Sequence, residues 1–186
     1  MTYTKADLKN WVKAYTEDLF KWALYKTSSE QLAEDLVQDT FLAAAEKLYG
    51  FKAESSPKTW LFSILNNKIV DYYRRKFKTP QTIGDDIIGE TFDDSGNWHK
   101  NRQPKDWQLE EHNILDDDDF KAVLKQCMDA LPAQWSSCMK LKYLMGKNGT
   151  EICQELEISP TNFWQIVHRA KLHLRKCLEN NWYKDY

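Results

Sequence analysis

The segment TWLFSILNNKIVDYYRRKFK, residues 59–78, carries side chains suited to holding unpaired nucleic acid. At 100° per residue, Trp60, Asn67, Asp71 and Arg74 fall along one line of a helix. Aromatic rings can stack on bases, amides can bond base edges, and arginines can hold phosphates. The alternative is a tryptophan that belongs to the core, followed by a basic helix end that is simply solvated.

Near the C-terminal end, the segment GTEICQELEISPTNFWQIVHRAKLHLRKCL predicts a short helix, a tight turn and a long helix. Ser159 followed by Pro160 is a typical start of the long helix. In a helix-turn-helix unit, the first residues of the second helix reach base edges in the major groove, and cations further along meet phosphates. The residues at these places are Thr161, Asn162, Trp164, Gln165, His168, Arg169, Lys171 and Arg175. The alternative is a pair of helices that meet at a turn for packing alone, and Trp164 is equally suited to DNA contact and to packing.

The sequence contains no motif typical of a catalytic site or a metal site. No nucleophile–base set, pair of catalytic carboxylates or phosphate-binding glycine loop is recognisable, and the chain has only six glycines. We therefore expect no catalytic residue and no cofactor. The four cysteines are Cys127, Cys138, Cys153 and Cys177, and none belongs to a C-x-x-C pair. Each falls in an apolar helical pattern, which favours reduced core thiols and argues against a metal site.

The net charge of −2 conceals an uneven distribution along the chain. Residues 1–80 carry 13 Lys and Arg against 10 Asp and Glu, residues 81–119 carry 3 against 12, and residues 120–186 carry 10 against 6. Two mildly basic blocks thus flank a strongly acidic connector. No apolar run approaches the length of a membrane span and the start is polar, so we expect a cytoplasmic protein without membrane insertion.

Helical periodicity dominates the first basic block. One helix is predicted from about residue 5 to 26, and a second from a cap at Ser28, with Gln31 completing a capping box, to Gly50. A third begins after a cap at Ser56. The apolar stripe of this third helix consists of Leu61, Leu65, Ile69 and Tyr72.

The second basic block is also helical, so the predicted fold class is all-α with two small domains. Asp118 or Asp119 is expected to cap a helix, and a further helix is expected at 132–144 before the helix-turn-helix. Short loops in the first block favour a compact helical bundle. We therefore predict a helical bundle domain at 1–80, an acidic linker at 81–118 and a helix-turn-helix domain at 119–186.

The connector is expected to be mostly irregular. It is dense in Asp, Gly, Asn and Pro, with one helical turn predicted after Pro104. Its isolated aromatic and aliphatic residues are too many for a plain spacer. They indicate a segment that either docks on a partner or packs back on the domains.

Three segments together resemble the bacterial RNA polymerase sigma factors of the extracytoplasmic-function group. They are AEDLVQDTFLAAAEKLYGF, TWLFSILNNKIVDYYRRK and, after the connector, LPAQWSSCMKLKYL with the helix-turn-helix segment. The resemblance implies a promoter-melting domain, a linker threaded through the polymerase and an upstream-element-binding domain. It therefore implies an alternative sigma factor that binds core RNA polymerase, recognises the −10 and −35 promoter elements and promotes DNA melting.

The resemblance also implies roles for individual residues. Asp35, Gln38 and Asp39 match the surface that docks on the clamp of core RNA polymerase. The loop that holds a flipped −10 base and the helix face that grips the opened strand are matched by Phe51, Lys52, Ser55, Ser56, Trp60, Asn67, Asp71, Arg74 and Arg75. Phe51 is suited either to plugging the bundle or to stacking on a base. An anti-sigma factor is a further partner that the resemblance suggests.

The chain departs from the family pattern in its recognition helix. Phe163, Trp164 and Ile166 stand where relatives often carry a small residue and then basic ones, and Cys153 stands where alanine is usual. The resemblance therefore does not imply which −35 bases are read.

Two other classes of function fit the sequence less well. A stand-alone helix-turn-helix repressor or activator would bind duplex DNA without polymerase, but it would leave the acidic second helix and the base-stacking face without a task. An enzyme acting on nucleic acid would need a metal or a general base held in a cleft, whereas the clustered carboxylates lie in the linker.

Overall fold

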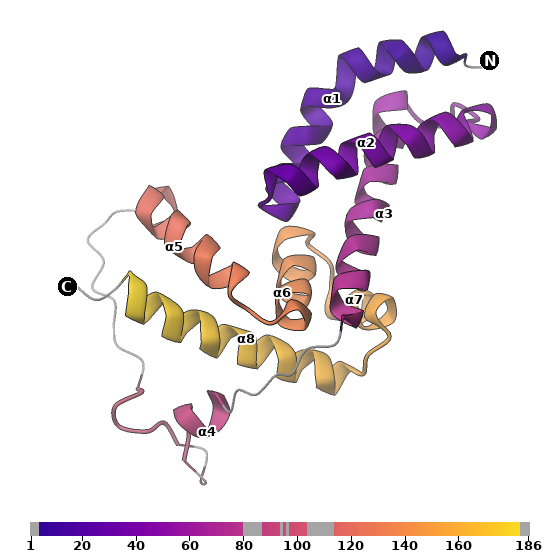
Figure 1. Cartoon of the computed structure of the whole chain (residues 1–186). Coiled ribbons are helices and arrows are strands. Elements are labelled where there is room, and N and C mark those ends of the chain that lie inside the picture. Colours follow the sequence, from indigo (N-terminus) through magenta and orange to yellow (C-terminus); the bar gives the residue numbers. More distant parts are fainter. Residues whose placement is uncertain (1–3, 80–86, 94, 96, 104–113, 183–186) are drawn as a thin grey trace. The chain divides into compact units, whose positions relative to one another are not determined.

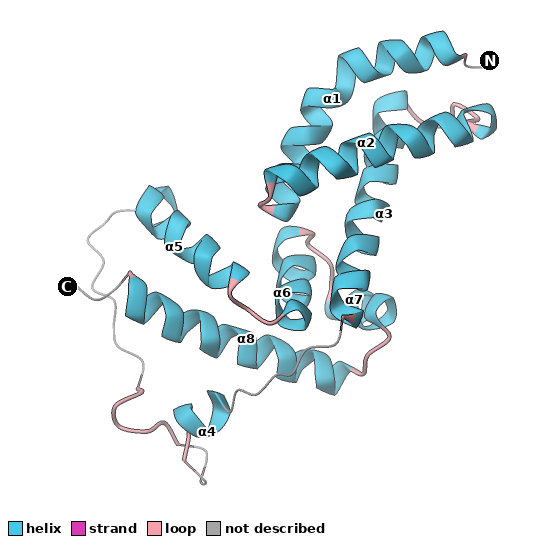
Figure 2. Cartoon of the chain, viewed as in Figure 1, coloured by secondary structure: helices cyan, strands magenta, loops and turns pink. Residues whose placement is uncertain are grey.

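The computed structural model describes residues 4–79, 87–93, 95, 97–103 and 114–182. Regular structure within these residues is helical, apart from one isolated antiparallel bridge between Phe92 and Trp98 (Figure 2). The chain divides into two compact units, so the predicted all-α class with two helical domains is confirmed. The first unit is Met1–Lys76 with Lys140–Lys147, and the second is Phe77–Met139 with Asn148–Tyr186.

The first unit is built on three long helices. They are α1 (Lys5–Thr27), α2 (Glu30–Lys47) and α3 (Pro57–Lys78), with a 3₁₀ turn at Leu48–Gly50 after α2 (Figure 1). Thr4 and Asp7 form a capping box at the start of α1, and the Ser56 hydroxyl accepts the Thr59 N–H at the start of α3.

The predicted cap at Ser28 is wrong by one residue. Ser28 ends α1 in the left-handed region, at φ 57°, and its N–H donates to the Leu24 carbonyl at 2.8 Å. Ser29 caps α2 instead, because its hydroxyl accepts the Leu32 N–H. Two adjacent serines thus divide the tasks of ending one helix and starting the next, and the expected capping box with Gln31 does not form.

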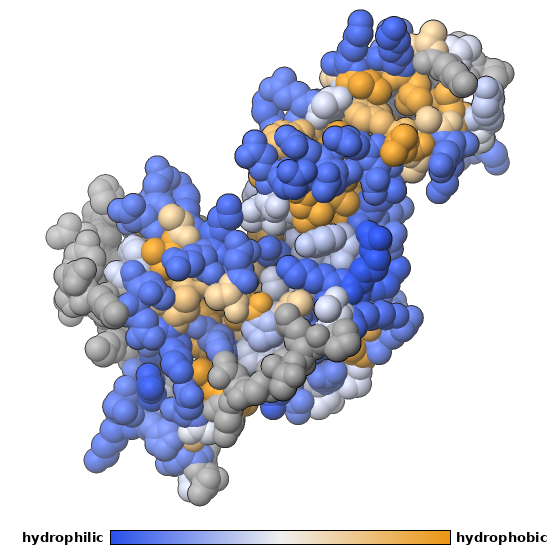
Figure 3. Space-filling view, in the orientation of Figure 1, coloured by the Kyte–Doolittle hydropathy of each residue, from blue (hydrophilic) through white to orange (hydrophobic). Residues whose placement is uncertain are grey.

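The core of the first unit lies where α3 meets α1 and α2. Leu61, Leu65 and Ile69 are fully buried, as the helical period predicts. The fourth position of the stripe is Tyr73 and not Tyr72, since Tyr73 is buried and donates its hydroxyl to the Lys26 carbonyl at 3.0 Å. On the face shown in Figure 3, apolar residues gather along the seam between α1 and α2, while hydrophilic residues cover their outer sides.

The second unit is arranged around one long helix. Its elements are α4 (Ile87–Thr91), a 3₁₀ turn (Ile114–Asp116), α5 (Asp118–Asp129), α6 (Ala133–Met139), α7 (Gly149–Leu156) and α8 (Pro160–Asn181). The π-helical turn at Lys140–Leu144, which follows α6 in the sequence, belongs to the first unit. Helices α4, α5, α6 and α7 all pack on α8. The helical turn predicted after Pro104 lies outside the described residues.

Side-chain caps begin α5, α7 and α8 in this unit. Asp117, and not the predicted Asp118 or Asp119, caps α5, and its carboxylate accepts the N–H groups of Asp119 and Phe120 at 2.8 and 3.1 Å. Asn148 forms a capping box at the start of α7. Ser159 caps α8 with Pro160 at its first position, as predicted.

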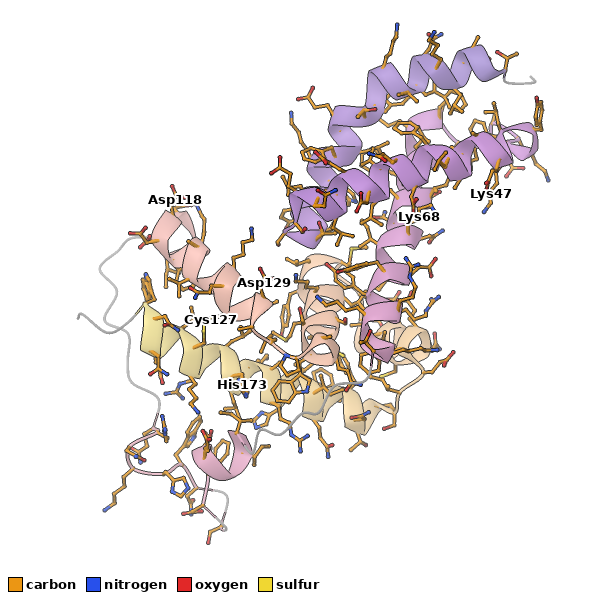
Figure 4. The ribbon with its side chains drawn as sticks, in the orientation of Figure 1. Lys47, Lys68, Asp118, Cys127, Asp129 and His173 are labelled. Atoms are coloured by element: carbon orange, nitrogen blue, oxygen red, sulfur yellow. A yellow bond between two sulfur atoms is a disulfide. The ribbon has the colours of Figure 1, made fainter. Side chains whose placement is uncertain are left out.

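Two of the four cysteines are joined, so the prediction of four reduced thiols is wrong. Cys127 in α5 and Cys177 in α8 form a disulfide across 50 residues of sequence, with their Cα atoms 5.8 Å apart. Figure 4 shows Cys127 on the side of α5 that faces α8. Cys138 and Cys153 are reduced and buried, and burial raises the pKa of the Cys138 thiol to about 12. The periodicity placed each cysteine in the core, but it could not reveal which two face each other.

This disulfide predicts a stability that depends on reductant. Closing a loop of this length stabilises a fold by about 2–4 kcal/mol. We expect dithiothreitol to lower the free energy of unfolding of the second unit by about that amount, measured by urea denaturation followed by circular dichroism. Cys127→Ser should remove the dependence on dithiothreitol, whereas Cys138→Ala should keep it. Equal stability of the wild-type chain with and without dithiothreitol would contradict the prediction.

Candidate nucleic-acid interface

The α3 face that the sequence singled out is exposed in its middle and half-buried toward its two ends. Asn67 and Asp71 are exposed, Arg75 is exposed beside them, and Arg74 is half-buried. Arg74 donates to the Asp71 carboxylate, with Nη1 and Oδ1 2.8 Å apart. This ion pair lies at the surface, where it contributes little stability, so the guanidinium can exchange Asp71 for a phosphate at low cost.

At the N-terminal end of the same face, Trp60 is half-buried against two aromatic rings. The rings of Phe51 and Trp60 stack with centroids 4.5 Å apart and planes at 21°. Trp11 meets Phe51 edge-on at 5.9 Å and Trp60 edge-on at 6.3 Å. This three-ring cluster fixes the orientation of the one large ring on the candidate strand-binding face.

The loop between α2 and α3 is fixed at both of its ends. Phe51 is only 9% exposed, so of its two expected roles the structure favours the plug of the bundle. Ser56 holds the other end as the α3 cap. Between them Lys52 and Ser55 are exposed, and Ala53 has a φ of +58°, a region that costs a residue with a Cβ atom about 1 kcal/mol. The loop therefore forms a polar rim, held at Phe51 and Ser56, next to the α3 face.

On α2, the outer face carries the acidic group that the sequence indicated. Asp35, Gln38 and Asp39 are exposed, and the ammonium of Lys68 lies 3.6 Å from the Asp39 carboxylate. Leu42, one turn further on, is 64% exposed. Leu42 is not among the residues predicted for this face, although its spacing of four from Gln38 places it there.

The helix-turn-helix forms as predicted from α7 and α8. The left-handed residue Glu157, at φ 58°, ends α7, and Ser159 begins α8. Besides Pro160, the exposed residues of the first three turns of α8 are Thr161, Asn162, Trp164, Gln165, His168, Arg169 and Lys171. The opposite face of the helix is core, since Phe163, Val167 and Ala170 are buried. One side of α8 thus holds the fold while the other remains available to DNA.

The C-terminal half of α8 is covered by a segment of the linker. The described residues 87–93, 95 and 97–103 include α4 and a turn in which the Asp93 N–H donates to the Asn97 carbonyl at 2.8 Å and the His99 N–H to the Thr91 carbonyl at 3.1 Å. The rings of Phe92 and Trp98 lie 4.6 Å apart. We call these described residues the linker module.

Three kinds of contact attach the linker module to α8. The Arg175 guanidinium lies over the Trp98 ring at 4.8 Å, the Phe92 ring stacks near His168 at 6.1 Å, and Lys176 pairs with Glu90. Within the described residues, the expectation of a segment that packs back on the domains is therefore the one the structure supports. Ile87 and Leu172 are both buried and line the same small pocket beneath the module.

This arrangement separates the predicted −35 residues into two groups. Those in the first turns of α8 share one exposed face. Arg175 stands apart, because it is half-buried, lies against Trp98 and donates from Nε to the Glu179 carboxylate at 2.7 Å. His168 lies at the border of the two groups, exposed yet stacked beside Phe92.

Comparison with known proteins finds two family matches along the chain. Residues 11–79 match sigma-70 region 2, and residues 121–174 match sigma-70 region 4. A probable RNA polymerase sigma factor of Haemophilus influenzae is 34% identical to this chain, and the aligned region covers 86% of this chain and 84% of the relative. The ECF RNA polymerase sigma factor SigM of Bacillus subtilis is 32% identical, and its aligned region covers 92% of this chain and 94% of SigM.

The chain belongs to the extracytoplasmic-function sigma factors of RNA polymerase. It is thus an alternative sigma factor that recognises promoters for transcription initiation. SigX of Bacillus subtilis, another such factor, is 27% identical over 89% of this chain and 80% of its own. In the described part of this sigma factor, no helix is long and apolar enough to cross a membrane, and no three His, Cys, Asp or Glu side chains cluster as metal ligands would.

Attachment of the linker module predicts protected amides in the linker of this sigma factor. We expect the His99 amide to exchange slowly with solvent in the wild-type chain, and Trp98→Ala to raise its exchange rate at least tenfold, because the ring contact with Arg175 is lost. Hydrogen exchange followed by NMR measures this. Trp22→Ala, which changes a half-exposed ring of α1, is the matched control and should leave His99 unchanged. Equal His99 exchange in the wild type and Trp98→Ala would contradict the packing.

The same attachment should weaken in acid. The hydrogen bond from Lys176, and then its charge, lower the pKa of the Glu90 carboxyl below its ordinary value of 4.5. A carboxyl with a lowered pKa in the folded state stabilises above its ordinary pKa, and the contribution is lost as the pH falls through the folded value. The protection factor of the His99 amide should therefore drop below pH 4.5 in the wild type. In Glu90→Gln it should already be low and should change less with pH.

Proposed function

We propose that this sigma factor docks on core RNA polymerase through the outer face of α2. Asp35, Gln38 and Asp39 are exposed there on successive turns, and they would repel DNA rather than bind it. Exposed Leu42 extends the same face with apolar area that water does not favour. An acidic and apolar stripe of this kind suits a basic, partly apolar protein surface.

The α3 face and its polar rim are proposed to hold the melted −10 element. Trp60 presents a ring fixed by Phe51 and Trp11, Asn67 offers an amide, and Arg74 offers a cation already at the surface. Removing a base from the stack costs a few kcal/mol, which a ready-made site can offset. The polar rim at Lys52, Ser55 and Ser56 lies next to this face and supplies polar groups for such a base.

The first three turns of α8 are proposed to read the −35 element in duplex form. Thr161, Asn162 and Gln165 carry groups that pair with base edges, and Arg169 and Lys171 follow as phosphate contacts. Because the two basic blocks carry net charges of only +3 and +4, the protein alone would bind DNA weakly and with a steep salt dependence. The polymerase supplies the remaining affinity.

The sigma factor is proposed to have no catalytic centre of its own, and to work in the cytoplasm where its polymerase works. RNA synthesis then belongs entirely to the core enzyme, and the sigma factor contributes binding energy. An anti-sigma factor remains an expected further partner. The observation that supports the proposal is that one chain exposes an acidic face on α2, a face with aromatic, amide and basic groups on α3, and a polar and basic face on α8.

The α2 assignment predicts a charge-reversal effect. Asp35→Lys should weaken binding to purified core RNA polymerase at least tenfold, since it places a cation where a complementary surface expects an anion. Glu17→Lys reverses an equally exposed helical acid on α1 and should change the affinity less than twofold. Fluorescence anisotropy of the labelled sigma factor gives both affinities. Unchanged binding by Asp35→Lys would overturn the α2 assignment.

The α3 assignment predicts a defect that a pre-opened template repairs. Asn67→Ala with Arg74→Ala should leave core binding intact but slow open-complex formation at least tenfold on duplex promoter DNA. A promoter with an unpaired −10 bubble should restore most of the rate, because the cost of melting is then removed. Lys21→Ala on α1 serves as the control cation. A defect that is equal on both templates would contradict a role in melting.

A further inference from the structure

Trp164 is the most exposed tryptophan among the described residues. Its side chain is 54% exposed, in the second turn of the helix that the proposed function places in the major groove. Tryptophan is usually well buried in a folded domain, so a ring with this much exposed area at this place offers an apolar surface to a ligand. Thr161 and Gln165 flank it, and both belong to the same exposed face.

The ring is held in place and is not loose at the surface. Trp164 meets the fully buried Phe163 edge-on, with ring centroids 5.1 Å apart. Gly149 at the start of α7 lies against both rings: a Cβ atom there would lie 3.2 Å from Cε1 of Phe163 and 3.7 Å from Cζ2 of Trp164. Absence of a side chain at Gly149 therefore lets α7 approach the two rings closely.

An open groove continues from the ring between α7 and α8. Ile158, Pro160 and Phe163 form its apolar side together with Trp164, and Asn148 and Gln154 contribute polar groups. The start of α8, which is proposed to contact bases, is thus more apolar than a surface that binds only phosphates and the polar edges of bases.

We infer that Trp164 reads a thymine in the −35 element through the C5-methyl group of that base. This inference rests on the proposed function, in which α8 enters the major groove. The thymine methyl is the one apolar group that an ordinary base pair presents in that groove, and apolar side chains contact it in sequence-specific complexes. A ring fixed at the start of α8 favours thymine and meets no matching group on cytosine.

The test removes the methyl group and nothing else. Promoter fragments that the sigma factor–core polymerase complex retains from a random library first supply the −35 sequence. Each thymine of that element is then replaced singly by deoxyuridine in a synthetic duplex, and the affinity of the complex is measured. Loss of one buried methyl predicts about a fourfold loss of affinity at one position, and no change at the others.

Two variants connect this effect to Trp164. Trp164→Ala should bind the thymine duplex more weakly and should bind the thymine and deoxyuridine duplexes equally. Gln165→Ala, on the same exposed face, should also weaken binding but should keep the fourfold ratio. Unchanged thermal unfolding of both variants shows that the fold is intact.

The inference is overturned if no thymine-to-deoxyuridine change weakens binding by the wild-type complex, or if Trp164→Ala keeps the fourfold ratio. Weaker association of Trp164→Ala with core polymerase and an unchanged thymine ratio would instead assign the ring to a protein contact, and would equally overturn it. Promoter binding by the wild-type complex in the same assay shows that the proposed function stands even where the methyl contact fails.

Discussion

The packing of α8 is the constraint on which the second unit depends. Its apolar face, with Phe163, Val167 and Ala170 fully or almost fully buried, holds α6 and α7 around it. Fixing that face determines which residues can point outward, because the helical period leaves no choice once the core face is set. The first turns then present polar side chains and Trp164 to solvent, and the later turns receive the linker module. A single amphipathic helix therefore serves the core, the candidate DNA interface and the linker.

The linker module changes how the acidic connector is understood. A plain tether would need only charge and length, whereas this module makes specific contacts with α8. Trp98 lies against Arg175, and Phe92 stacks near His168. Glu90 pairs with Lys176. Cations that the sequence assigned to phosphates are thus partly engaged by acidic and aromatic groups of the same unit. Any passage of the connector through the polymerase must either keep these contacts or replace them.

Much of the fold and of the interface could be predicted from local sequence. Leu61, Leu65 and Ile69 follow the helical period and are buried, and Ser159 with Pro160 starts α8 where expected. Contacts between residues far apart in the sequence could not be predicted. Nothing in the local pattern pairs Cys127 with Cys177 across 50 residues, and nothing brings Trp98 onto Arg175. The choice between two adjacent residues of the same type was also hard to predict. Ser28 and Ser29 are both good helix caps, and only the geometry of the chain reversal selects between them.

The central claim is that two nucleic-acid surfaces on one chain act on a promoter only when the polymerase carries them. Footprinting of one promoter fragment by the free protein and by its complex with core polymerase tests this most directly. The account predicts two separate protected blocks with the complex and none with the free protein at physiological salt. Strong protection by the free protein that is unchanged when core polymerase is added would contradict it.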